Sequence, residues 1–269
     1  MSSESQGPLT NPGEIANWPL LKIKYNTDPA CIEKLLPPGI TPGKNPTVNI
    51  TIYNFPVLNE PEYGYVISVD ADYNGTEGEY TLAIGIDQEA AVFGSQERWG
   101  QPKFPATTQY YRLIDQVTAK LTHQGYTFLE FSGKATGAGN IPPASATAAP
   151  EEFETNEWWL KYARSVDVMS TEFDYPPHVV QVYSKFGTAH IEELDCELKL
   201  NESPWDPIAT LLPMKSQAKA HLWTPIFLDR KITLAGKLDA NAFFPYADTI
   251  GGSRWPGESG GPKKTLYKE

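Results

Sequence analysis

Residues 94–103 read Gly-Ser-Gln-Glu-Arg-Trp-Gly-Gln-Pro-Lys, and the apolar run Ala90–Phe93 leads into them. Two glycines and a proline in so short a stretch predict a sharp bend, because glycine tolerates positive φ and proline restricts φ. The bend ends on Lys103, which Phe104 follows. A lysine held among side chains such as Trp99 and Phe104 would lose contact with water, and desolvation favours the neutral amine. A neutral lysine amine can attack a ketone and form a Schiff base.

The order of a glycine, a glutamate and then Gly-x-Pro-Lys resembles the signature of the acetoacetate decarboxylase superfamily. In that family the lysine after the proline forms the Schiff base, so the resemblance implies this role for Lys103. Glu97 stands at the family's spacing before the lysine, and it is a catalytic candidate that would brace the bend through its backbone or through Arg98. Arg98, Trp99 and Phe104 are substrate-binding candidates. The alternative is a hairpin corner with a solvated lysine, because lysines are almost never fully buried.

The resemblance also points to residues outside this stretch. The position of an active-site arginine of the family holds Trp18, so a carboxylate binder is expected to be missing. The family's catalytic glutamate belongs near Tyr63, and Glu62 is the candidate here. Several relatives use a tyrosine of the C-terminal aromatic end in proton transfer, which makes Tyr246 a catalytic candidate. The alternatives are a solvated loop carboxylate for Glu62 and a packed aromatic ring for Tyr246.

Imine chemistry sets a physical threshold for Lys103. A free lysine has a pKa near 10.4, so only about 0.04% of it is neutral at pH 7. Burial that lowers the pKa by ~3–4 units would remove most of this penalty. In acetoacetate decarboxylase a second lysine follows the first and adds like-charge repulsion, but Phe104 stands there in this chain. We therefore expect desolvation by Trp99 and Phe104 to lower the pKa without help from a neighbouring cation.

The composition limits the partners of the protein. The chain has 269 residues and a formal net charge of −11, which argues against nucleic acid or an anionic membrane as a partner. Two distant cysteines and four histidines show no metal-ligand spacing, so we expect no metal ion and no cofactor. The polar start is not a signal peptide, and no run approaches the ~18 apolar residues of a membrane span. We expect a cytoplasmic homo-oligomer that acts on a small keto compound.

Hydrophobic alternation predicts most of the strands. Leading examples are Leu20–Tyr25, Thr47–Phe55, Tyr63–Asp70, Glu79–Ile86, Val117–Thr122, Tyr126–Ala135, Val179–Tyr183 and Glu192–Leu200. Asp28 and Pro29 mark the start of a short helix. His123 falls in a turn and is expected to be solvated. Residues 151–164 are expected to continue a loop, in which the aromatic side chains could form one helical patch.

The resemblance implies one α+β domain. Its mostly antiparallel strands would close into a barrel-like cone around a cavity, with a few helices outside. We place a disordered tail at residues 1–14, the single domain at 15–250 and a C-terminal tail at 251–269.

The function implied is a lyase that forms a Schiff base through Lys103. Aldol condensation with dehydration is favoured, because three departures from the family at once suggest changed chemistry: Trp18, a doubtful Glu62 and Phe104. Decarboxylation of an acetoacetate-like β-keto acid is the alternative. A third possibility, from another class, is a non-catalytic binder that uses the same cavity.

Overall fold

The structure is a computed structural model, and it describes residues 19–57, 60–137 and 152–264. Its elements lie in this order: β1 (Leu20–Asn26), α1 (Pro29–Glu33), β2 (Thr41–Pro42), β3 (Thr47–Val57), β4 (Glu60–Tyr73), β5 (Thr76–Ile86), α2 (Glu89–Trp99), β6 (Lys103–Pro105), β7 (Thr107–Leu113), β8 (Gln116–His123), β9 (Tyr126–Ala135), β10 (Glu152–Arg164), β11 (Phe173–Leu200), α3 (Ile208–Leu211), β12 (Lys219–Lys237), α4 (Ala240–Phe243), the 3-10 turn η1 (Phe244–Tyr246), β13 (Gly257–Glu258) and β14 (Gly261–Pro262).

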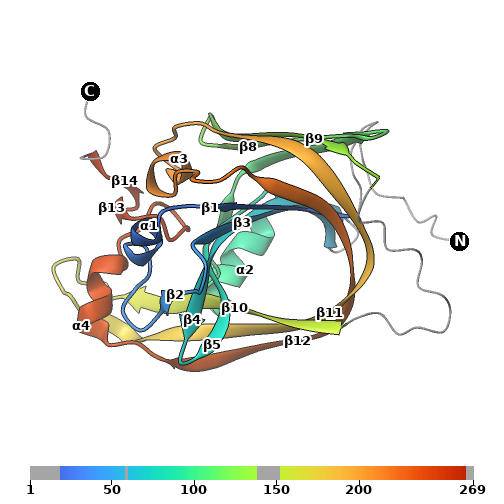
Figure 1. The fold of residues 1–269 in the computed structure, drawn as a ribbon. Helices are drawn as coiled ribbons and strands as arrows, with labels where there is room; N and C mark the ends of the chain where they lie inside the picture. Colours follow the sequence, from blue (N-terminus) through green and yellow to red (C-terminus); the bar gives the residue numbers. More distant parts are fainter. Residues whose placement is uncertain (1–18, 58–59, 138–151, 265–269) are drawn as a thin grey trace, which may run out of the picture.

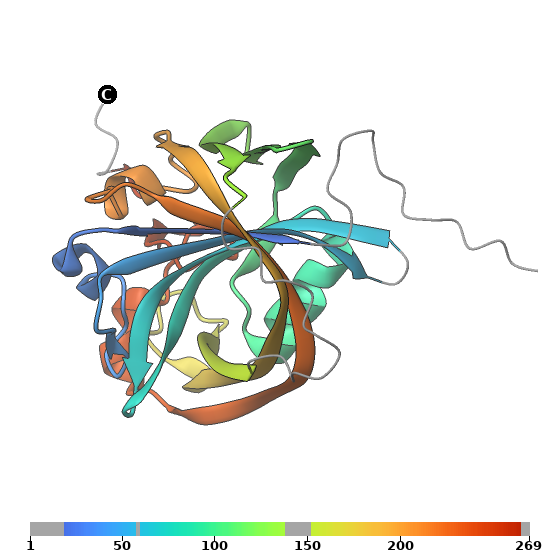
Figure 2. The same cartoon turned by 45° about the vertical axis from the view of Figure 1, so that its right-hand side comes forward.

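The strands form a closed ring (Figure 1). Hydrogen bonding runs in the order β10-β5-β4-β3-β1-β12-β11, and β10 also pairs with β11, which returns the sheet to its start. The pairings are antiparallel except those of β5 with β10 and with β6. Figure 2 shows the long strands β11 and β12, coloured gold to red-orange, curving around one side of the ring. The expected barrel of mostly antiparallel strands with a few short helices is confirmed.

The two faces of the ring wall differ in character. Cross-strand partners share a face, and successive partners connect Lys22, Thr51, Val66, Ile84 and Lys103 in one row across β1, β3, β4, β5 and β6. The charge of Glu157 in β10 raises the pKa of Lys22 in β1, although these two strands are not neighbours in the sheet. Such an interaction crosses the interior, so the row faces the inside of the ring.

The main apolar core lies on the outer face of the ring wall. Leu21, Ile50 and Tyr65 point outward and pack with the sheet of β7, β8 and β9, which continues from β11. The rings of Tyr65 and Phe128 meet edge to face, with centroids 5.5 Å apart. Trp255 is fully buried in the same cluster, although the sequence placed it in a tail. The interior can therefore carry polar groups, because the core that stabilises the fold lies elsewhere.

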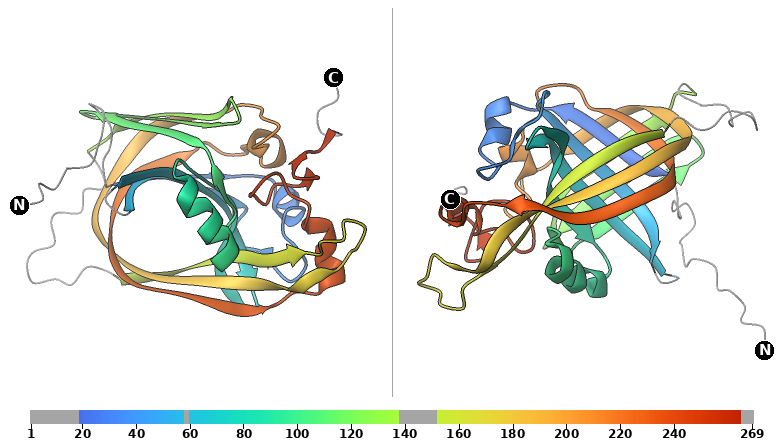
Figure 3. Two further views of the ribbon diagram at one scale, coloured as in Figure 1. Left: turned by 180° about the vertical axis from the view of Figure 1, so that it is seen from behind. Right: turned by 90° about the horizontal axis from the view of Figure 1, so that it is seen from below.

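Helix α2 covers part of the ring interior. Val92 packs against Ile84 and Ile86, and Trp99 packs against Trp159, all on the inner face of the wall. From behind, α2 stands at the opening of the ring (Figure 3). None of the helices among the described residues is long and apolar enough to cross a membrane.

The expected start of α1 is confirmed, and the expectations for residues 151–164 and 179–200 differ from the structure. Asp28 caps α1 by accepting the N–H of Ala30, with Pro29 in the first turn, as expected. The expected loop or helical patch over residues 151–164 is instead strand β10, which lies between β5 and β11. The two short strands expected between residues 179 and 200 are parts of the single strand β11. The misreading of β10 has a physical reason, because its strand state depends on partners that are distant in the sequence.

Candidate active site

The turn before Lys103 is fixed by contacts from two distant segments. Gly100 ends α2 with a left-handed φ of 68°, and a Cβ there would lie against the carbonyl oxygen of Leu160 and 2.6 Å from the Cα of Lys161. The Arg254 guanidinium donates to the carbonyl oxygens of Gly100 at 2.9 Å and Leu160 at 2.8 Å. The turn therefore requires glycine at position 100 and positions the start of β6. Gly94, which we expected to share in the bend, lies within α2.

The Lys103 side chain projects from β6 into the interior of the ring. It pairs in the sheet with Ile84 of β5, and it is only 8% exposed. Its Nζ lies 4.0 Å from Oε1 of Glu62, whose side chain is 7% exposed. Burial is the largest cause that lowers the pKa of Lys103 below its usual value, while the charge of Glu62 raises it and that of Arg230 lowers it. The ammonium form is thus disfavoured by desolvation and by a second cation.

Glu62 and Tyr53 form a hydrogen-bonded pair beside the lysine. The Tyr53 hydroxyl donates to Oε1 of Glu62 at 3.1 Å. Burial, followed by the negative charges of Glu62, Asp87 and Glu157, raises the pKa of Tyr53 well above its usual value. The hydroxyl therefore keeps its proton at neutral pH and remains a donor to the carboxylate.

Further charges face the inside of the ring beyond Lys103, and the Arg230 side chain among them is exposed to solvent. Arg230 of β12 lies 4.0 Å from Glu157 of β10, measured from Nη2 to Oε1. The Nζ of Lys22 donates to Thr51 Oγ1 at 2.8 Å and lies 5.4 Å from the centre of the Trp223 ring. Burial lowers the pKa of Lys22 and raises that of Glu157, in each case as the largest cause. The interior thus offers both cations and carboxylates to a polar ligand.

Phe104 does not accompany Lys103 into the interior. Consecutive residues of a strand point to opposite faces, and Phe104 points into the outer core. Its ring packs on His123 at a centroid distance of 4.5 Å and on Tyr65 at 6.3 Å. Side chains other than Phe104 must therefore shield the lysine from water. We expected no neighbouring cation to lower the pKa of Lys103, but the charge of Arg230 does so.

His123 is buried in the outer core rather than solvated in a turn. Its Nδ1 lies 2.6 Å from Oδ2 of Asp206, and this carboxylate is fully buried. The expectation of a solvated histidine was wrong, because it ended the strand β8 at residue 122 and did not include the segment after β11, which supplies Asp206 and Trp205.

The remaining sequence candidates lie at other places. Glu97 and Arg98 are exposed on α2, and Arg98 lies over the ring of Trp99, which is partly buried. Tyr246 lies in η1, where it packs against the outer core cluster. Its charge contributes to raising the pKa of Tyr80. Trp18 lies outside the described residues. Among the other candidates that the structure describes, Glu62 is the one that forms an ion pair with Lys103.

Sequence reasoning missed Tyr53 and Arg230. Tyr53 lies on the polar side of β3 together with Asn49 and Thr51, a side that the alternation of this strand distinguishes from the aliphatic one. That signal could have drawn attention to Tyr53. We find no local signal for Arg230, since only the closure of the ring places β12 opposite β6.

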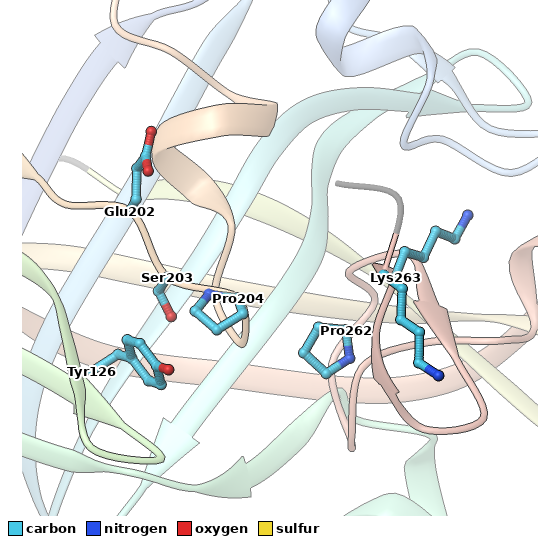
Figure 4. Close-up of a pocket in the computed structure, with 7 residues that line it drawn as sticks. Tyr126, Glu202, Ser203, Pro204, Pro262 and Lys263 are labelled. Atoms are coloured by element: carbon cyan, nitrogen blue, oxygen red, sulfur yellow. The ribbon is translucent and has the colours of Figure 1, made fainter. Parts of the chain in front are cut away.

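A surface pocket of about 680 Å³ lies elsewhere (Figure 4). The turn before β9, the segment after β11 and the C-terminal hairpin line it, and its lining includes Tyr126, Ser203 and Lys263. It shares no lining residue with the interior around Lys103. No group of three potential metal ligands occurs within the part of the chain that the structure describes.

The chain is similar in sequence to known proteins. The family model described as acetoacetate decarboxylase (ADC) matches residues 2–238. An acetoacetate decarboxylase of Chromobacterium violaceum is 34% identical over 106 residues, which are 36% of this chain and 42% of that protein. The match spans less than half the length of this curated relative.

Two solved structures share the fold. The acetoacetate decarboxylase of Legionella pneumophila superposes with a TM-score of 0.66 at 18% identity, covering 84% of this chain and 86% of the other. The enduracididine biosynthesis enzyme MppR, complexed with pyruvate, superposes with a TM-score of 0.59 at 13% identity, covering 81% and 91%. MppR has also been seen with the condensation product of pyruvate and imidazole 4-carboxaldehyde.

Proposed function

Because this chain belongs to the acetoacetate decarboxylase family, we propose that Lys103 forms a Schiff base with a small keto acid. The observation that carries the proposal is the buried Lys103 amine inside the ring, with a carboxylate 4.0 Å away. The lowered pKa of this lysine increases the fraction that is neutral and nucleophilic. The charge of Arg230 also lowers the pKa of this amine, and Arg230 is the cation that would attract the carboxylate of the substrate.

The proposed steps balance without a cofactor. The neutral Lys103 nitrogen attacks the ketone carbon, and the carbinolamine takes up one proton from solvent and loses water to give a protonated imine. Glu62 then removes a proton from the carbon next to the imine carbon, which leaves a neutral enamine. That carbon lies two bonds beyond the nitrogen, so a carboxylate 4.0 Å from Nζ is near enough to accept the proton. This assigns to Glu62 the proton transfer that the sequence suggested for Tyr246.

We favour aldol condensation with dehydration as the reaction of the enamine. The enamine carbon attacks an aldehyde, whose oxygen takes up a proton and becomes a hydroxyl. The attacking carbon then loses its second proton, the hydroxyl leaves as water, and a further water hydrolyses the product imine and frees Lys103. A substrate carboxylate held by Arg230 is stabilised in its ionised form, which favours chemistry that retains it over loss of CO₂. The fold is shared with MppR, which binds pyruvate and a pyruvate condensation product.

Decarboxylation of a β-keto acid is the second candidate. The protonated imine would accept the electron pair of the breaking carbon–carbon bond, CO₂ would leave, and a proton would then return to carbon. The identity to a curated acetoacetate decarboxylase favours this reaction. A non-catalytic binder is the third candidate, and it would bind keto acids without forming an imine.

Borohydride reduction separates these candidates. With pyruvate or acetoacetate, we expect a covalent adduct whose mass maps to Lys103 and which is absent from Lys103→Ala. Lys22→Met is the matched control, because it removes another interior lysine with a lowered pKa and should leave the adduct intact. A folded protein that forms no adduct with several keto acids would contradict the enzyme proposal and leave the binder.

Two products, measured in parallel, distinguish aldol condensation from decarboxylation. We expect condensation of pyruvate with an aldehyde to exceed CO₂ release from acetoacetate, and Tyr246→Phe to change neither rate greatly. Rapid CO₂ release that disappears in Lys103→Ala would assign the decarboxylase instead.

A further inference from the structure

We propose that Tyr53 is a positioning residue that holds the Glu62 carboxylate away from Lys103. This inference rests on the proposed function. It concerns how a carboxylate can exchange protons with an imine on Lys103 without forming a direct hydrogen bond to the ammonium. The same oxygen, Oε1 of Glu62, accepts the Tyr53 hydroxyl at 3.1 Å and is the one that lies 4.0 Å from Nζ of Lys103. The hydroxyl therefore anchors the carboxylate oxygen that lies nearest to the amine.

The backbone provides the space for this arrangement. Tyr53 of β3 is the cross-strand partner of Gly64 in β4, and Glu62 precedes this glycine by two residues on the same face. A Cβ at Gly64 would lie 2.6 Å from both Cζ and Oη of Tyr53. The tyrosine ring thus lies across a position without a side chain, and this lets the hydroxyl reach Glu62.

The distance between Glu62 and Lys103 matters because the lysine needs to be neutral. At 4.0 Å the carboxylate attracts the ammonium without accepting a hydrogen bond from it, since such bonds are about 2.7–2.9 Å long. A direct bond would stabilise the ammonium further and raise the pKa of Lys103. Glu62 is nevertheless close enough to exchange a proton with an imine. Holding the carboxylate at this intermediate distance reconciles the two requirements.

The other charges around this group would remain in place when the hydroxyl is removed. Arg230 of β12 acts on Lys103 from across the ring and lowers its pKa. The pKa of Tyr53 is raised by the negative charges of Asp87, which follows β5, and Glu157 of β10. Tyr53 is also coupled electrostatically to Tyr65, whose pKa it raises. A change caused by Tyr53→Phe would therefore report on Glu62 and Lys103.

The test is the pH dependence of borohydride trapping with pyruvate in Tyr53→Phe. Without the hydroxyl, Glu62 can move onto the amine, so the midpoint should rise by about one pH unit and trapping at pH 7 should slow about tenfold. Gly64→Ala displaces the same ring by another route and should shift the midpoint in the same direction. Tyr65→Phe is the matched control, because its hydroxyl faces Asp206 in the outer core, and it should leave the midpoint unchanged.

A double-mutant cycle with Glu62→Gln identifies the mechanism. Glu62→Gln should lower the midpoint, and adding Tyr53→Phe to it should produce no further shift. A midpoint in Tyr53→Phe equal to that of the wild type, or the same upward shift with and without Glu62, would overturn the proposal. These outcomes require that the wild type is trapped at Lys103, so a wild type without an adduct refutes the proposed function instead.

Discussion

The two glycines of the stretch Gly94–Lys103 should respond to alanine with opposite signs. Gly94 lies inside α2, is exposed, and a Cβ there would meet no atom within 4 Å. Alanine is about 0.8–1.0 kcal/mol better than glycine in a helix interior. Gly94→Ala should therefore increase the free energy of unfolding by roughly 0.5–1 kcal/mol.

Gly100→Ala should be destabilising for two reasons that add. The left-handed backbone at Gly100 costs a residue with a Cβ about 1–2 kcal/mol. The new Cβ would also meet backbone atoms of Leu160 and Lys161, which cannot rotate away as a side chain can. If β10 moves to relieve this contact, Arg254 loses one of its charge-assisted hydrogen bonds, worth about 1.5–3 kcal/mol. The sum is a loss of about 2.5–5 kcal/mol.

Urea unfolding of both variants, followed by tryptophan fluorescence, measures the two effects. We also expect Gly100→Ala to slow borohydride trapping under folding conditions, because Lys103 lies three residues beyond the displaced turn, while Gly94→Ala should leave it unchanged. A Gly100→Ala protein within about 0.5 kcal/mol of the wild type, an effect typical of a neutral surface substitution, would refute this account of the turn.

Three other variants test the surroundings of the site. Asp206→Ala should lower the free energy of unfolding by about 3–5 kcal/mol, because it leaves His123 without its buried partner, and a smaller loss in urea unfolding would show that the pair is weakly coupled. Arg254→Met should cost about 2–4 kcal/mol in the same assay through its lost bonds to Gly100 and Leu160, and stability equal to the wild type would contradict the clamp. The folded pKa of Lys103 is lowered, so the unfolded chain binds more protons between that pKa and about 10.4, and stability should rise with pH across this window. Lys103→Met should flatten that rise in unfolding measured from pH 7 to 10, and an unchanged slope would mean that the lysine is not perturbed.

The sequence reveals the features of this fold that depend on local chemistry. The Asp28 cap follows from a short polar side chain before Pro29, and the alternation of Thr47–Phe55 reflects one face of β3 packed in the core. Residues 152–164 lack such a local signal. Their aromatic spacing is compatible with a helical patch, and they become strand β10 through pairing with β5 and β11. Only the assembled ring supplies those partners.

The residues of the site also divide into those that the sequence identifies and those that only the assembled ring brings together. The motif identifies Lys103. The resemblance brings Glu62 into view because it lies two residues from Gly64, the position that the family's spacing from Lys103 indicates. Phe104 was expected beside the amine because it is adjacent in sequence, yet the alternation of a strand sends it to the opposite face. Arg230 lies more than a hundred residues beyond Lys103, and its influence requires β12 to stand across the interior.

Closure of the ring is therefore part of the chemistry as well as the fold. Burial and the Arg230 charge lower the pKa of Lys103, whereas the Glu62 charge raises it, and the three groups come from β6, β12 and β4. An open sheet would leave the amine solvated and Arg230 distant, and the pKa would return toward that of a free lysine. Because the main core packs on the outer face and the inner face carries only two smaller apolar clusters among the described residues, part of the interior is left for charged groups. The interior can hold charged groups whose purpose is to set the protonation of one amine, and it is this separation of core from site that makes imine chemistry on Lys103 physically reasonable.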